Sequence, residues 1–142
     1  MPDRKNLMTI FFVGMVVLQT IGCGSSSNSN RVLQVVTVTP STADGLNSPI
    51  GQVPFTANGT FSKSPSPAPV SFVAPYSGGW QSSDPSIATL FATGTGTGTA
   101  TFQCVAGASG VVTITATAST NAATGTGATS TAASGTAQLT CP

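Results

Sequence analysis

Residues 110–118 have the sequence GVVTITATA, and this stretch decides the fold class of the chain. An apolar residue stands at every second position: Val112, Ile114, Ala116 and Ala118. Because successive side chains of a strand point to opposite faces, this period of two predicts a strand with an apolar inner face. The threonines between them are β-branched and suit the half-exposed outer face.

The same alternation extends outward from this stretch in both directions. It predicts seven short strands, at 32–39, 52–61, 70–73 with a continuation near Trp80, 87–91, 99–106, 110–118 and 135–141. Asp44-Gly45 marks a tight turn after the first strand. Pro54 has no backbone donor, so the start of the second strand is expected at an edge or in an unpaired position. No amphipathic helix is expected. Seven strands at this spacing predict an all-β, immunoglobulin-like β-sandwich.

The N-terminal segment has the pattern of an export signal. Arg4 and Lys5 precede an apolar run at residues 7–18, and a glycine and Cys23 follow. This arrangement resembles the signal of a bacterial lipoprotein, in which the cysteine is lipidated and becomes the mature N-terminus. Thr20 departs from that pattern, because lipoprotein signals usually carry leucine or a similar apolar residue there. Two alternatives are an ordinary secretory signal and a membrane-spanning anchor, which needs about 20 apolar residues.

The lipoprotein interpretation divides the chain into three parts. Residues 1–22 are the signal peptide, residues 23–31 are the lipidated cysteine and a flexible Ser/Asn-rich tether, and residues 32–142 are the sandwich domain. The lipid on Cys23 would hold the protein to the membrane of the bacterial envelope. By analogy with Gram-negative lipoproteins, Gly24 after the cysteine favours the outer membrane.

The charge content excludes several classes of function. The chain has four Lys or Arg residues, three Asp or Glu residues and no histidine. A neutral surface does not attract a phosphate backbone, so no nucleic acid partner is expected. Catalytic triads and zinc sites would lack imidazole, and general acid–base catalysis would lack positioned titratable groups. We therefore expect a non-enzymatic protein without cofactor or metal.

Cys104 and Cys141 are predicted to form a disulfide. Both lie on the inward faces of their strands by the alternation above. If these strands take the E and G places of a sandwich, they run the same way and end at the same end of the domain. Export beyond the cytoplasm permits the bond. The alternative is two buried free thiols.

Residues 80–90, WQSSDPSIATL, carry a family resemblance. They resemble the W-x-S-S-D-P-x-I-A-T signature of bacterial Ig-like domains of group 2 (BIG2), and segments 36–40, 55–61 and 110–118 resemble other strands of that family. The resemblance covers about residues 32–141. It implies that Trp80 fills the core and that Asp84 closes a turn rather than binding calcium. The signature residues are Trp80, Ser83, Asp84, Pro85 and Ile87.

Several features depart from the family pattern. The proline run at 64–69, the Gly-Thr loop at 93–98 and the loop at 121–134 are longer or looser than usual. The cysteine pair is not a general feature of the family.

The family resemblance implies surface adhesion or protein interaction, with an unknown protein or glycan as partner. The alternative is a structural role, as an envelope spacer or an accessory subunit of a larger assembly. A third class, carbohydrate binding, would require coplanar exposed aromatic rings. An adhesion module should present an aromatic or apolar patch at one loop end, around Tyr76, whereas a spacer should be covered uniformly by Thr and Ser. Tyr76 is the candidate for a binding loop, with a packed tyrosine as the alternative.

Overall fold

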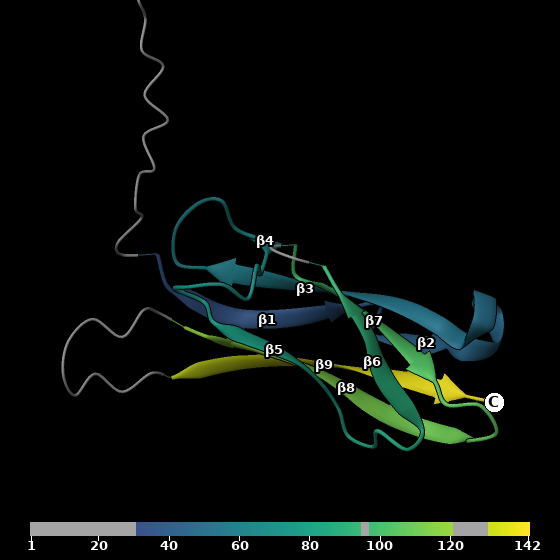
Figure 1. Cartoon of the computed structure of the whole chain (residues 1–142). Helices are drawn as coiled ribbons and strands as arrows, with labels where there is room; N and C mark the ends of the chain where they lie inside the picture. Colours follow the sequence, from purple (N-terminus) through teal and green to yellow (C-terminus); the bar gives the residue numbers. More distant parts are fainter. Residues whose placement is uncertain (1–30, 95–96, 121–130) are drawn as a thin grey trace, which may run out of the picture.

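Two β-sheets packed face to face form the domain in a computed structural model, which describes residues 31–94, 97–120 and 131–142 (Figure 1). One sheet has the strand order β1-β3-β7-β6, with β4 paired to β3, and the other has the order β2-β9-β8-β5. The elements are β1 (Leu33–Thr39), β2 (Thr42–Asp44), η1 (Gly45–Asn47), η2 (Pro49–Gly51), β3 (Gln52–Phe61), β4 (Ala68–Pro69), β5 (Gly78–Ser82), β6 (Ala88–Thr93), β7 (Thr99–Cys104), β8 (Gly110–Ser119) and β9 (Ala132–Cys141).

The strand order is that of an immunoglobulin-like sandwich. The sheet β1-β3-β7-β6 has the A-B-E-D order, and β5, β8 and β9 take the C, F and G places of the other sheet. β2 pairs with β9 in parallel, after the chain has crossed from one sheet to the other. The predicted all-β sandwich is therefore confirmed, although the described residues hold more than seven strands because β2 and β4 are added.

Two predicted segments differ from the structure. Residues 70–73 are not a strand: Val70 is buried and donates to the carbonyl of Ala57, but Phe72 has a φ of 54°, which ends the extended conformation. The proline run at 64–69, which the alternation does not predict as a strand, contributes β4, which pairs with Asn58 and Gly59 of β3.

Pro54 lies where β3 has a single neighbouring strand. β1 pairs with β3 only as far as Thr56, whereas β7 pairs with β3 from Gln52 to Thr56. Pro54 is paired with Thr101 of β7 and has no strand on its other side, in agreement with the expected edge position.

The core follows the period of two in the sequence. Val112, Ile114, Ala116 and Ala118 are buried, as predicted. The largest fully buried side chains come from both sheets and from the segment after β4: Phe55, Phe102, Leu33, Ile114, Leu139, Val70 and Val112. Each such side chain contributes about 1.5–3 kcal/mol by leaving water. The outward positions of β8 carry mainly threonine, so hydroxyl groups cover that face.

Gly135 allows the two sheets to approach closely beside β1. A Cβ at this position would lie 2.8 Å from the carbonyl carbon of Val36, which is backbone and cannot swing away. Glycine is therefore required where β9 passes under β1.

Candidate functional site

A disulfide joins the two sheets at one end of the domain. Cys104 ends β7 in one sheet and Cys141 ends β9 in the other, and their Cα atoms lie 5.6 Å apart. The predicted pairing is confirmed, because both strands run toward the same end, as the E and G assignment requires. The alternative of two free thiols is wrong.

The loop between β2 and β3 folds over this disulfide. A Cβ at Gly45 would lie 2.6 Å from the Cys104 sulfur, so a glycine lets the loop pass close to the bond. The Asp44 carboxylate accepts a hydrogen bond of 2.9 Å from the Leu46 amide and caps η1. The predicted turn at Asp44-Gly45 is thus a capped 3-10 turn that leaves Leu46 pointing outward, 70% exposed.

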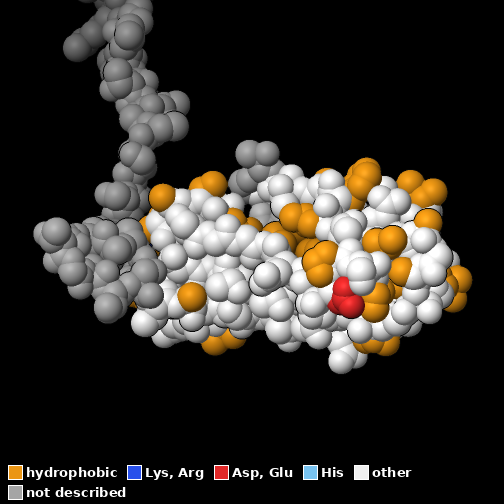
Figure 2. All heavy atoms as spheres, turned by 60° about the horizontal axis from the view of Figure 1, so that its bottom comes forward, with side chains coloured by type: hydrophobic (Ala, Val, Ile, Leu, Met, Phe, Trp, Pro, Cys, Tyr) orange, Lys and Arg blue, Asp and Glu red, His pale blue; other side chains and the backbone are white. Residues whose placement is uncertain are grey.

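Exposed apolar side chains gather at this end of the domain. We call Leu46, Ile50, Val105 and Pro142 the disulfide-end patch. Ile50 is 76% exposed, and it lines a shallow depression together with Val105 and Pro142. On the face drawn in Figure 2, apolar side chains gather toward the end where the chain terminates, and charged side chains are sparse.

The backbone at Ile50 is strained. Its φ is 51°, in the left-handed region that β-branched residues rarely adopt. Such a conformation costs about 1–2 kcal/mol. The Gln103 amide donates to the Ile50 carbonyl over 3.4 Å and helps to hold the loop against β7. Strained residues of this kind concentrate at functional sites.

Tyr76 lies at the opposite end of the sandwich and is packed. Leu33 and Phe61 pair at that end, whereas Gln52 and Gln103 pair at the disulfide end. The Tyr76 ring is 9% exposed and meets Phe61 at a centroid distance of 5.2 Å. Of the two interpretations of Tyr76, the structure therefore supports the packed tyrosine, although Val73 in the same loop is 52% exposed.

Arg31 completes the cluster around Tyr76. The Tyr76 hydroxyl donates a 2.8 Å hydrogen bond to the Arg31 carbonyl. The Arg31 guanidinium lies 3.4 Å from the centroid of the Phe61 ring and donates to the carbonyls of Lys63 and Pro65. These contacts fix the point at which the chain enters the domain.

The signature segment after Trp80 forms a turn between β5 and β6. Ser83 exchanges two hydrogen bonds with Thr113, each 2.9 Å long, and so extends the β5–β8 pairing. The Asp84 carboxylate accepts from the Ser86 hydroxyl at 2.6 Å and from the Ser86 amide at 2.9 Å. Pro85 is exposed, and Ile87 packs against the core. Asp84 therefore closes a turn, as the resemblance implied.

These hydrogen bonds give Asp84 a lowered pKa. The Ser86 hydroxyl and amide hold the carboxyl pKa below its ordinary value. A lowered pKa in the folded state contributes stability above the unfolded pKa, and this contribution is lost as the pH falls through the folded pKa. Because the chain has no histidine, we expect no such loss near neutral pH.

We expect the urea midpoint of unfolding to stay constant between about pH 5 and pH 8 and to fall below about pH 4. The urea midpoint of the variant Asp84→Asn should fall less at low pH than that of the wild type, because asparagine has no carboxylate that can be protonated. Urea titrations of both proteins across this range measure the effect. A midpoint that shifts between pH 5 and pH 8 would contradict it.

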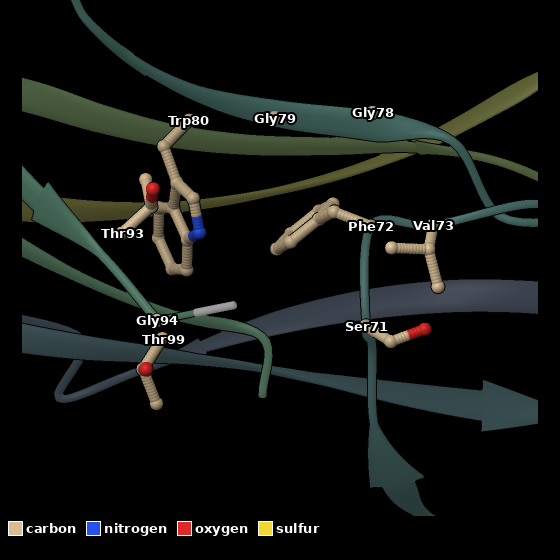
Figure 3. A pocket seen from close by; sticks show the side chains of 9 residues that line it. All are labelled: Ser71, Phe72, Val73, Gly78, Gly79, Trp80, Thr93, Gly94 and Thr99. Atoms are coloured by element: carbon tan, nitrogen blue, oxygen red, sulfur yellow. The ribbon is translucent and has the colours of Figure 1, made fainter. Parts of the chain in front are cut away.

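Trp80 has one side against the core and another at a cavity. Its ring centroid lies 6.3 Å from that of Phe102 and 5.7 Å from that of Phe72. The ring is partly buried, so it fills the core only in part. A cavity of about 280 Å³ lies beside it, bordered also by Phe72 and the hydroxyl residues Ser71, Thr93 and Thr99 (Figure 3).

Neither a membrane helix nor a metal cluster is found in the described ranges. None of their helices is long and apolar enough to cross a membrane. Nowhere in these ranges do three or more His, Cys, Asp or Glu residues gather as metal ligands. Cys23 and the signal segment before it lie outside the described residues.

No protein-family model matches the chain, and no curated protein or solved structure matches it at a significant level. The resemblance to group 2 bacterial Ig-like domains therefore stays a prediction.

Proposed function

We propose that this chain is a non-enzymatic, lipid-anchored interaction module of the bacterial envelope, which binds a partner protein through the disulfide-end patch. The position of this patch is the observation that carries the proposal. The chain enters the domain at Arg31, which lies at the Tyr76 end, and the patch lies at the other end. A domain tethered through Cys23 would therefore turn the patch away from the membrane.

The character of the patch favours interaction over a spacer role. A spacer should be covered uniformly by Thr and Ser, as the outer face of β8 is from Thr113 to Ser119. At the disulfide end, Leu46 and Ile50 instead expose most of their side chains to solvent. Exposed apolar patches mark interaction sites. The partner surface that fits is apolar, since Leu46 and Ile50 are the most exposed large apolar side chains of the described residues.

The lipid anchor is tested by the variant Cys23→Ala. We expect wild-type protein in the membrane fraction, with an intact mass that corresponds to residues 23–142 plus acyl chains. The variant should lose the acyl mass and leave the membrane fraction, because one lipidated cysteine supplies the whole anchor. Equal membrane retention of the two proteins would overturn the lipoprotein part of the proposal.

The patch is tested by photo-cross-linking in intact cells. A photoreactive residue at position 50 should give a discrete adduct, and one at position 115, on the hydroxyl-covered face of β8, should not. The variant Ile50→Gly should lower partner binding without lowering the urea midpoint, because glycine relieves the left-handed backbone and the lost side chain is 76% exposed.

Two outcomes would contradict the patch proposal. Equal labelling from positions 50 and 115 would indicate the spacer role. An adduct with the mass of two copies of this chain would mean that the patch binds a second copy and not another protein. Sedimentation of the purified domain would then show a dimer.

A further inference from the structure

We propose that the cavity between Trp80 and Phe72 is a binding site for one residue of a neutral saccharide. This site is separate from the disulfide-end patch and does not depend on the function proposed for it. The cavity is formed by the start of β5, the segment after β4, and the ends of β6 and β7 that face each other (Figure 3). Its volume of about 280 Å³ is at the lower end of ligand pockets, which suits a single sugar ring.

The indole N–H of Trp80 lacks a hydrogen-bond partner. Its nitrogen is buried, and no acceptor among the described residues reaches it. Buried indole N–H groups usually have a partner, because an unpaired buried donor destabilises the fold. The Phe72 ring offers at most a weak N–H···π contact. Figure 3 shows the indole nitrogen on the side of the ring that faces Phe72 and the cavity.

The lining of the cavity matches the chemistry of a sugar. Ser71, Thr93 and Thr99 supply hydroxyl groups, and Trp80 and Phe72 supply apolar ring surface. Of the residues that the structure describes, none of those bordering it is Lys, Arg, Asp or Glu. A sugar ring carries both hydroxyl groups and apolar C–H edges without charge. The two aromatic rings meet at 66° and are not coplanar, so the ligand would enter an angled cleft rather than stack on a flat platform.

Phe72 is the wall that would move. Its φ of 54° is strained for a residue with a side chain, and its ring is only partly buried. A shift of this residue would relieve the strain and open a path to the indole N–H. A sugar hydroxyl would then accept the hydrogen bond that Trp80 lacks in the structure.

The experiment uses Trp80 as its own reporter, because the chain contains one tryptophan. The purified domain is titrated with glucose, galactose, N-acetylglucosamine and short neutral oligomers of these sugars. Fluorescence emission and the single indole N–H cross-peak in a ¹H–¹⁵N spectrum are recorded. We expect a saturable change of both signals with at least one sugar, and a downfield shift of the indole proton.

Variants locate the site. Thr93→Val removes a hydroxyl and keeps the shape, so it should weaken sugar binding about fivefold, as expected for one lost hydrogen bond of about 1 kcal/mol. Phe72→Ala should change the affinity more strongly. The matched controls are Thr115→Val on β8 and Ile50→Gly in the patch, and neither should change the affinity.

The proposal is overturned if no neutral sugar gives a saturable change in either signal. It is also overturned if Thr93→Val and Phe72→Ala leave the sugar affinity intact, or if a proline-rich peptide saturates the indole signal and sugars do not. None of these results bears on partner binding at the disulfide-end patch.

Discussion

Replacing Cys104 and Cys141 together by alanine should lower the free energy of unfolding by about 4 kcal/mol. The two cysteines are 37 positions apart in the chain, and the entropy of closing a loop of this size in the unfolded state corresponds to that value. The free energy of unfolding of a domain of this size is about 5–15 kcal/mol, so the loss is a large share of its stability.

The disulfide also has a local role that the double variant would expose. It joins the two sheets at the end where residues 45–51 and 105–109 cross from one sheet to the other, and Gly45 in the loop between β2 and β3 lies against the Cys104 sulfur. Loss of the bond should therefore loosen the disulfide-end patch before the rest of the domain. Urea unfolding measures the global effect, and amide hydrogen exchange at residues 45–51 measures the local one.

The control for this prediction is the wild-type protein with its disulfide reduced. It should unfold at nearly the same urea concentration as the double alanine variant, because both lack the covalent link. The prediction would be contradicted if the free energy of unfolding of the double variant lay within about 1 kcal/mol of that of the oxidised protein. The unfolded chain would then gain little conformational freedom when the bond is absent.

The regular strands could be predicted because burial alone determines their pattern. β3 and β8 lie within one residue of the predicted bounds, since apolar and polar residues alternate along their whole length. β9 begins at Ala132 rather than at residue 135, because its first residues are small and are held by pairing with the end of β8. β2 has three residues and gains its extended form from β9, a partner more than ninety positions away that no local pattern indicates.

The candidate sites were less accessible to sequence reasoning. Leu46 and Ile50 are isolated apolar residues in turns, and only the fold brings Ile50 beside Val105 and Pro142. A signal did exist: Leu46 and Ile50 stand in a turn-rich segment where strand alternation does not account for apolar residues. The sequence makes Tyr76 a candidate for binding because it is an aromatic residue in a loop, yet Arg31 and Phe61 cover it in the structure. The unpartnered N–H of Trp80 depends on the angle of Phe72, which no sequence pattern specifies.

Phe102→Ala should lower the free energy of unfolding by about 3–5 kcal/mol, which is the usual cost of truncating a buried phenylalanine. Phe102 is fully buried and central to the core, with Phe55 at 6.1 Å and Trp80 at 6.3 Å between ring centroids. Its loss leaves a void that rigid strands on both sheets cannot close, and it removes the ring that supports Trp80 from the core side. The emission of the single tryptophan should therefore shift to the red.

The matched control is Phe91→Ala on the neighbouring strand β6. Phe91 is 58% exposed, so its truncation should change the free energy of unfolding by no more than about 0.5 kcal/mol and leave the tryptophan emission unchanged. Urea unfolding followed by tryptophan fluorescence measures both variants. The prediction would be wrong if Phe91→Ala and Phe102→Ala lowered the free energy of unfolding by similar amounts. Side chains of the edge strand β6 would then contribute as much to packing as the side chains between the sheets, where the alternation of β7 and β8 places the core.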